Sequence, residues 1–189
     1  MKKGKWSVIC ASMKAGRYRP LLMMFLVAGS MTIGAKIHTE LFGTTVTMQT
    51  FFLCLTAMYF KPTEVLLGQI LYLVTGFWAP VFASDYLANV VLLGSSAGYL
   101  YAFPIAAWVL AKYGKSDEWF TQFSWTVMAH FIILLAGYLW LLLYAEMDRD
   151  MAFIAGFLSL LPGAITKGGL ATVFVQIGNR LFRKSKNEA

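Results

Sequence analysis

Charged residues are scarce in this sequence of 189 residues: Asp, Glu, Lys and Arg together make up only 13% of it. Soluble domains carry roughly 25% charged residues, so the composition excludes an ordinary soluble globular domain. Hydrophobic residues instead make up 59% of the chain. The sequence therefore predicts an integral membrane protein. Its length suits a handful of spanning segments of ~20 residues and leaves no room for a separate soluble domain.

Groups that usually carry catalysis are also few. No Asp or Glu lies inside an apolar stretch, which argues against a carboxylate proton relay and a metal-dependent phosphotransferase. No Walker-type loop is present, so the chain cannot itself hydrolyse ATP by that chemistry. Cys10 and Cys54 have no metal-ligand neighbours and are expected at different depths, without a disulfide. His38 and His130 are isolated, and we interpret both as structural. We expect neither an enzyme nor a bound metal or cofactor.

A basic tail, residues 1–19, precedes the apolar part of the chain. We interpret it as a retained cytoplasmic segment, because a signal peptide has a shorter charged region and a small-residue cleavage site. Residues 20–182 form one predicted all-α transmembrane domain, and residues 183–189 a short cytoplasmic tail. The domain has six apolar stretches, predicted as six helices: Pro20–Ile37, Thr45–Phe60, Val65–Phe82, Tyr86–Ala111, Phe120–Ala145 and Met151–Phe182.

Basic residues are distributed unevenly over the predicted loops. With an even number of helices, both termini lie on one side, and that side holds every Lys and Arg except Lys36, Arg149 and Lys167. The positive-inside rule then places both termini in the cytoplasm. The net charge of +7 is thus a topology signal and not a nucleic-acid site. We expect a multi-pass protein of the cytoplasmic (inner) membrane.

Lys167 interrupts the apolar run LLPGAITKGGLATVFVQIG, Leu160–Gly178. A lysine at the centre of a membrane helix costs about 2.5–3.5 kcal/mol on insertion scales, so such a residue usually faces a bundle interior or a watery cavity. Snorkelling to the interface is the alternative. A helix that begins near Pro162 would place the ammonium one or two turns inside the outer leaflet. We expect Lys167 to bind a carboxylate or phosphate group.

The segment GSSAGYLYAFP, Gly94–Pro104, breaks the fourth stretch. Its small residues permit an unwound segment, which is tolerated at depth only where it lines a cavity or is buried in protein. Tight helix packing with interfacial tyrosines is an equal alternative. Tyr99 offers a flat apolar face with a polar tip.

The segment TTVTMQT, Thr44–Thr50, opens the second stretch. An extended entry would aim Thr45, Thr47 and Gln49 at one face, because side chains alternate along a strand. The amide of Gln49 offers a donor and an acceptor. Structural hydrogen bonding between helices is the alternative role.

Four blocks, in this order, resemble the BioY family of biotin transporters, which are substrate-binding S components of energy-coupling-factor (ECF) transporters. The blocks are TTVTMQTFF, GFWAPVFA, GSSAGYLYAFPIAA and LLPGAITKGGLA. They are similar to the family's V-P-V-T-L-Q-T, G-x-P-V-F-A, G-P-T-G-G-Y-L-x-G-F-P and L-P-G-D-x-x-K-x-x-L-A. The resemblance covers about residues 20–180.

The resemblance implies a six-helix S-component bundle that binds biotin near the outer face and delivers it inward. Lys167 would pair with the valerate carboxylate, and the fused rings would rest on Tyr99. Asn89, ten residues before Tyr99, and Gln49 would hold the ureido group.

The resemblance also implies partners: a transmembrane coupling protein and a pair of ATPase subunits. Ala28, Ser30 and Gly34 in the first stretch have the small-residue spacing of a close helix contact. This contact is either internal or with a partner, and we take these residues as the candidate docking face.

Several positions depart from the family pattern. Ser95 stands where the family usually has Pro, Ala97 and Ala102 where it has Gly, and Ala164 where it has Asp. Without that Asp, a ligand carboxylate or another group must balance the charge of Lys167. An S component for a different anionic vitamin is therefore the alternative function. An intramembrane enzyme and a ligand-free structural membrane protein are more distant alternatives.

Overall fold

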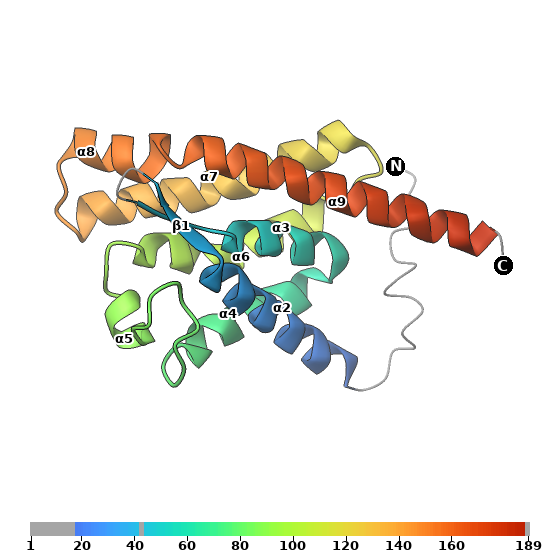
Figure 1. The fold of residues 1–189 in the computed structure, drawn as a ribbon, viewed down its shortest axis with the longest axis horizontal. Helices are drawn as coiled ribbons and strands as arrows, with labels where there is room; N and C mark the ends of the chain where they lie inside the picture. The colour runs from blue at the N-terminus through green and yellow to red at the C-terminus, as the bar shows by residue number, and fades with distance from the viewer. Residues whose placement is uncertain (1–17, 42–43, 188–189) are drawn as a thin grey trace.

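The structure, a computed structural model, describes residues 18–41 and 44–187. The long helices α7 and α9 lie side by side along one edge of the molecule, and α2, α4 and α5 lie at the opposite edge (Figure 1). The elements are α2 (Arg19–Lys36), β1 (His38–Leu41), β2 (Thr44–Thr47), α3 (Gln49–Tyr59), α4 (Pro62–Thr75), α5 (Ala88–Val91), α6 (Ala97–Tyr113), α7 (Trp119–Leu143), α8 (Arg149–Phe153), the π-helical segment η1 (Ile154–Leu158) and α9 (Leu161–Asn187).

The all-α prediction misses a β-hairpin. Strands β1 and β2 pair antiparallel, with His38 opposite Thr47. The run TTVT of β2 consists of β-branched residues, which favour extended backbone over helix. The N–H of Met48 then donates to the carbonyls of Gly34 (3.0 Å) and Ile37 (2.9 Å), which ties the end of the hairpin to α2. The predicted helix Thr45–Phe60 therefore begins only at Gln49, and the residues before it form the extended entry that was one possibility for this segment.

The third stretch ends as a helix at Thr75, before the predicted Phe82. Pro80 cannot continue a helical hydrogen-bond ladder, and residues 76–87 form a loop. The loop folds back so that the ring of Phe82 packs edge-on against Tyr72 of α4, with ring centroids 5.4 Å apart. A Cβ at Gly76 would lie 2.2 Å from the Phe82 ring, so this return requires glycine there.

Glu64 lies inside a helix, because α4 begins at Pro62 and not at Val65. Proline suits the first position of a helix, where its missing N–H costs nothing. The Glu64 side chain is buried, accepts a hydrogen bond from the Lys61 N–H (2.9 Å) and pairs with Arg19 of α2 (3.3 Å). This carboxylate joins the ends of two helices.

The sixth stretch is a composite of α8, η1 and α9. The N–H of Ser159 donates to the carbonyl of Ile154 (2.9 Å), five residues back, as in a π-helix. Pro162 falls in the first turn of α9, where it is tolerated. The helix then continues to Asn187, beyond the predicted end at Phe182.

Helix length alone does not establish six membrane spans. Among the described residues, two helical runs are long and apolar enough to cross a bilayer, Trp119–Leu143 and Arg149–Leu181. Helices α3 and α4 contain 11 and 14 residues, which is short of the ~20 that a perpendicular span needs.

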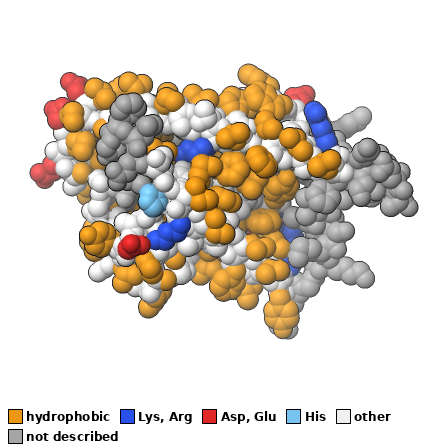
Figure 2. Space-filling model, in the orientation of Figure 1, with side chains coloured by type: hydrophobic (Ala, Val, Ile, Leu, Met, Phe, Trp, Pro, Cys, Tyr) orange, Lys and Arg blue, Asp and Glu red, His pale blue; other side chains and the backbone are white. Residues whose placement is uncertain are grey.

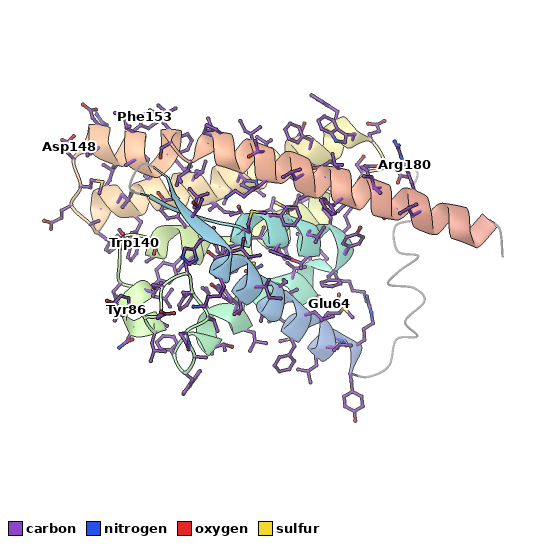
Figure 3. The ribbon with its side chains drawn as sticks, viewed as in Figure 1. Glu64, Tyr86, Trp140, Asp148, Phe153 and Arg180 are labelled. Atoms are coloured by element: carbon purple, nitrogen blue, oxygen red, sulfur yellow. The ribbon has the colours of Figure 1, made fainter. Side chains whose placement is uncertain are left out.

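The surface carries apolar side chains between two charged ends. Hydrophobic side chains cover much of the face shown in Figure 2. Helix α2 exposes large ones along its outer side: Leu21, Leu22, Phe25, Leu26 and Ile33. Asp148 lies at the end of the molecule formed by α8, and Arg180 lies at the opposite end, where α2 begins and α9 ends (Figures 1 and 3).

Candidate functional site

A cavity of about 600 Å³ lies toward the end of the molecule at which α8 is found. Residues from the hairpin, the start of α3, the loop 76–87, residues 95–96, α6, α7, η1 and α9 line it. This volume is in the range of ~300–1,000 Å³ typical of small-molecule sites. Segments far apart in the sequence thus meet around one space, and three of the four predicted ligand residues line it: Lys167, Gln49 and Tyr99.

Lys167 projects from α9 to the hairpin. Its Nζ donates a hydrogen bond to the backbone carbonyl of Thr47 (3.0 Å), and the side chain is half-buried. Among the described residues that line the cavity, none is Asp or Glu. A backbone carbonyl satisfies one of the three N–H donors of an ammonium but does not neutralise its charge. The site therefore favours an anionic group beside Lys167.

Gln49 begins α3 and is almost fully buried. The Thr47 hydroxyl donates to its Oε1 (2.8 Å), and its Nε2 donates to the Tyr72 hydroxyl (2.6 Å). These bonds fix the orientation of the amide and link α3 to α4. Structural hydrogen bonding between helices, the alternative role for Gln49, is therefore present. One N–H of Nε2 is left over, because an amide nitrogen carries two. The predicted role in ligand binding stays a prediction that this geometry permits.

Tyr99 of α6 is held in place from two sides. Its hydroxyl donates to the Gly156 carbonyl of η1 (2.6 Å), and its ring packs on Gly137 of α7. A Cβ at Gly137 would lie 2.0 Å from Cε1 of Tyr99, so only glycine leaves room for the ring. Tyr99 therefore presents a fixed aromatic side chain to the cavity.

The unwound segment before α6 lines the cavity and also packs tightly. Ser95 and Ser96 are cavity residues, while the Trp140 indole N–H donates to the Gly94 carbonyl (3.0 Å; Figure 3). A Cβ at Gly98 would lie 2.2 Å from the Trp140 Cβ. The two alternatives weighed from the sequence, cavity lining and close packing, therefore both hold at different residues of the same segment.

Asn89, the fourth predicted ligand residue, does not line the cavity. It lies on the short helix α5, where Ala88 and Val91 form the buried face and Asn89 is exposed. Residues three apart share one face of a helix, so burying Ala88 and Val91 turns Asn89 outward. The spacing from Tyr99 could not show this rotation.

The small residues of the first stretch mostly make internal contacts. Ala28 and Gly34 are buried, and a Cβ at Gly34 would lie 3.0 Å from backbone atoms of Gln49 in α3. Ser30 is half-buried, and its hydroxyl donates to the carbonyl of Val27 (2.7 Å). The internal alternative therefore accounts for Gly34. The docking face stays a prediction, and Ala28 and Gly34 are largely buried within the chain.

His130 and Thr50 were not selected from the sequence as site residues, yet both line the cavity. His130 is 4% exposed, its Nδ1 lies 2.8 Å from the Thr126 carbonyl oxygen, and its Nε2 has no hydrogen-bond partner among the described residues. The Thr50 hydroxyl, likewise buried, has none either. An ionisable residue inside an apolar stretch was the signal used for Lys167, and it applies equally to His130.

Comparison with known proteins gives two relatives, one similar structure and one family match. A protein named as a probable biotin transporter BioY, from Pyrococcus horikoshii, is 28% identical over 157 residues, or 82% of this chain and 92% of that protein. The biotin transporter BioY2 of Lactococcus lactis subsp. cremoris is 31% identical over 133 residues, or 68% of this chain and 72% of the relative.

A crystal structure of the S-component for biotin from an ECF-type ABC transporter has a TM-score of 0.75, with 17% identity. The alignment covers 86% of this chain and 91% of that one, so the predicted S-component-like fold is confirmed. The sequence also matches the BioY family over residues 7–184. Since that match spans nearly the whole sequence, the chain belongs to the BioY family.

Proposed function

We propose that this chain is the substrate-binding S component of a biotin transporter and binds biotin in the cavity beneath the β-hairpin. Two observations support this proposal: relatives of the chain are named as biotin transporters, and the chain has the S-component fold. It makes the chain a transport subunit and not an enzyme. The observation that carries it is the Lys167 ammonium, which lies in a cavity of about 600 Å³ and, among the described residues, has a backbone carbonyl as its hydrogen-bond partner.

The functional groups of biotin match the side chains that line the cavity. Its valerate carboxylate would pair with Lys167, replacing the missing negative charge. Its fused rings would contact the aromatic face of Tyr99, and its ureido group needs both donors and acceptors, for which Gln49 retains one N–H. Asn89 enters this arrangement only if α5 rotates on binding, because its side chain is exposed here.

The topology is part of the proposal. We place the cavity near the outer face, because it lies toward the Asp148 end and away from the end where α2 begins and the basic α9 terminates. The apolar outer side of α2 and the tight packing of the shorter helices support a six-segment, multi-pass bundle in the cytoplasmic membrane with both termini inside. Delivery of biotin inward would then use an ECF coupling protein and its two ATPase subunits.

The test is a calorimetric titration of the detergent-purified protein with biotin, beside lipoate and pantothenate as other anionic vitamins. We expect saturable binding of biotin and none of the other two. The buried methyl of Ala164, where the family pattern has Asp, is the observation that favours a different anionic vitamin. Binding of lipoate or pantothenate in preference to biotin would establish that alternative.

Tyr99→Phe gives a second, smaller prediction. Removing the hydroxyl leaves the Gly156 carbonyl without its 2.6 Å hydrogen bond, which we expect to lower the free energy of unfolding by about 1 kcal/mol. Because the freed ring lines the cavity, biotin affinity should fall as well. Thermal unfolding and calorimetry measure the two effects.

The matched control is Tyr101→Phe on the same helix. The Tyr101 hydroxyl donates to the Leu92 carbonyl (2.7 Å), and Tyr101 does not line the cavity. This variant should lose similar stability and keep its biotin affinity. Equal affinities for the two variants would show that the hydrogen bond between Tyr99 and Gly156 is not needed for biotin binding.

A further inference from the structure

The imidazole of His130 has one nitrogen engaged and one free. Its Nδ1 lies 2.8 Å from the backbone carbonyl oxygen of Thr126, four residues earlier on α7. A carbonyl oxygen only accepts, so Nδ1 carries a proton and donates it to this bond. In the neutral ring, Nε2 is then a bare acceptor. The ring sits among apolar helices with no acidic side chain among the described cavity residues, so nothing there would offset an imidazolium charge.

The free Nε2 is buried, and its residue lines the cavity. His130 is 4% exposed, and no described group donates to Nε2. Leaving a buried acceptor without a donor costs about 1–3 kcal/mol, and most buried polar groups in proteins are paired. A donor is therefore missing at Nε2, and a bound ligand can supply it once the side chains that cover this buried atom move aside.

The imidazole also lies against the face of α9 that carries Ala164. A Cβ at Gly168 would lie 3.6 Å from Cε1 of His130, the carbon between the two ring nitrogens. Ala164 precedes Gly168 by one turn on the same face, is buried, and lines the same cavity. The methyl of Ala164 offers no acceptor, whereas the Thr126 hydroxyl (3.1 Å from the same Cβ) and the His130 ring both lie against this face. The Thr126 hydroxyl already donates to the Phe123 carbonyl, so the unpaired polar atom beside this face is Nε2 of His130.

We propose that Nε2 of His130 accepts a hydrogen bond from an N–H group of the bound ligand. It does so beside Ala164, whose methyl side chain offers no hydrogen-bond acceptor. This proposal rests on the proposed function, under which the N–H belongs to the ureido group of biotin. A neutral acceptor leaves Lys167 as the only charged side chain among the described cavity residues. The ammonium therefore remains available for the ligand carboxylate and is not neutralised by the protein.

The test combines His130→Ala with biotin and with the two biotin derivatives that carry a methyl group on one ureido nitrogen or the other. His130→Ala should weaken biotin binding by about 10- to 100-fold, as expected when a buried donor loses its acceptor. One of the two N-methyl derivatives lacks the donor in question. For that derivative, parent and variant should bind equally. Adding Ala164→Asp to His130→Ala should restore part of the biotin affinity, because it returns an acceptor to the same face.

Gln122→Ala is the matched control. Gln122 is a fully buried polar residue of the same helix, accepts a hydrogen bond from Gln176 (2.8 Å) and does not line the cavity. The Gln122→Ala protein should be less stable than the parent and bind biotin with the parent's affinity. A folded His130→Ala protein with the parent's affinity for biotin would overturn the assignment and leave the proposed function standing. A parent that binds no biotin at all would overturn both.

A measurement on the parent protein covers the case in which His130→Ala does not fold. The chain has only two histidines, so ¹⁵N-histidine labelling gives two rings, which a His38→Gln sample assigns. Biotin should move the Nε2 resonance of His130 upfield, as a new hydrogen bond to a bare imidazole nitrogen does. A resonance unmoved at saturating biotin would contradict the assignment.

Discussion

Lys167→Ala is expected to weaken biotin binding by about 10- to 100-fold, since hydrogen bonds to charged groups contribute ~1.5–3 kcal/mol. The variant removes the ammonium that donates to the Thr47 carbonyl and leaves the ligand carboxylate buried without a counter-charge. Calorimetry with the parent and the variant, each titrated with biotin and biotin amide, measures the effect. Biotin amide should bind the parent about as weakly as biotin binds the variant. The two changes together should cost little more than either alone, because both remove the same pair.

Lys112→Ala is the control for this experiment. The Lys112 ammonium lies 4.5 Å from the ring centroid of Trp108 near the end of α6, outside the cavity. Removing it takes away one positive charge without touching the site, so biotin affinity should not change. If Lys167→Ala bound biotin as tightly as the parent, biotin would remain the ligand and the carboxylate–lysine pair would be wrong.

Gly137→Ala is expected to disrupt the site through packing alone. The added Cβ would lie 2.0 Å from Cε1 and 2.2 Å from Cζ of Tyr99, far inside contact distance. The ring cannot retreat freely, since its hydroxyl is bonded to Gly156. Overpacking of this kind costs typically ~1–3 kcal/mol, and here it also displaces a cavity side chain. We expect a lower unfolding temperature together with a loss of biotin binding, measured by thermal unfolding and calorimetry.

Gly29→Ala tests whether any glycine-to-alanine change in a helix would have this effect. A Cβ at Gly29 would meet no atom within 4 Å, because the residue lies on the exposed side of α2. This variant should keep or slightly raise stability, as alanine is the better helix former, and leave biotin binding intact. Parent-like stability and affinity in Gly137→Ala would show that α6 and α7 can separate to accommodate the methyl group.

Some features could be predicted from the sequence because they depend on local chemistry. The alternation of Thr45, Thr47 and Gln49 suits an extended entry, which would place them on one face, and residues 44–47 form strand β2. Lys167 stood out because an ammonium in an apolar run requires a cavity or a partner, and the Lys167 side chain lines the cavity. The order of the four motif blocks identified the family, which the match over residues 7–184 shows.

Other features depended on how the elements turn against each other. Asn89 has the sequence spacing of a ligand residue, but burial of the opposite face of α5 points it outward. Gly34 has the spacing of a docking face, but α3 packs onto it. The same rule that selected Lys167 applied to His130, yet only the fold shows that its Nδ1 is engaged and its Nε2 is free.

The sequence by itself determined the membrane class, the family and Lys167 as a cation within an apolar run, because these depend on composition, motif order and the cost of a charge in hydrocarbon. The tertiary structure alone decided which polar atoms converge on the cavity. Helix rotation and the close approach of Tyr99 to Gly137 depend on contacts between residues distant in the chain, and no local pattern specifies those contacts.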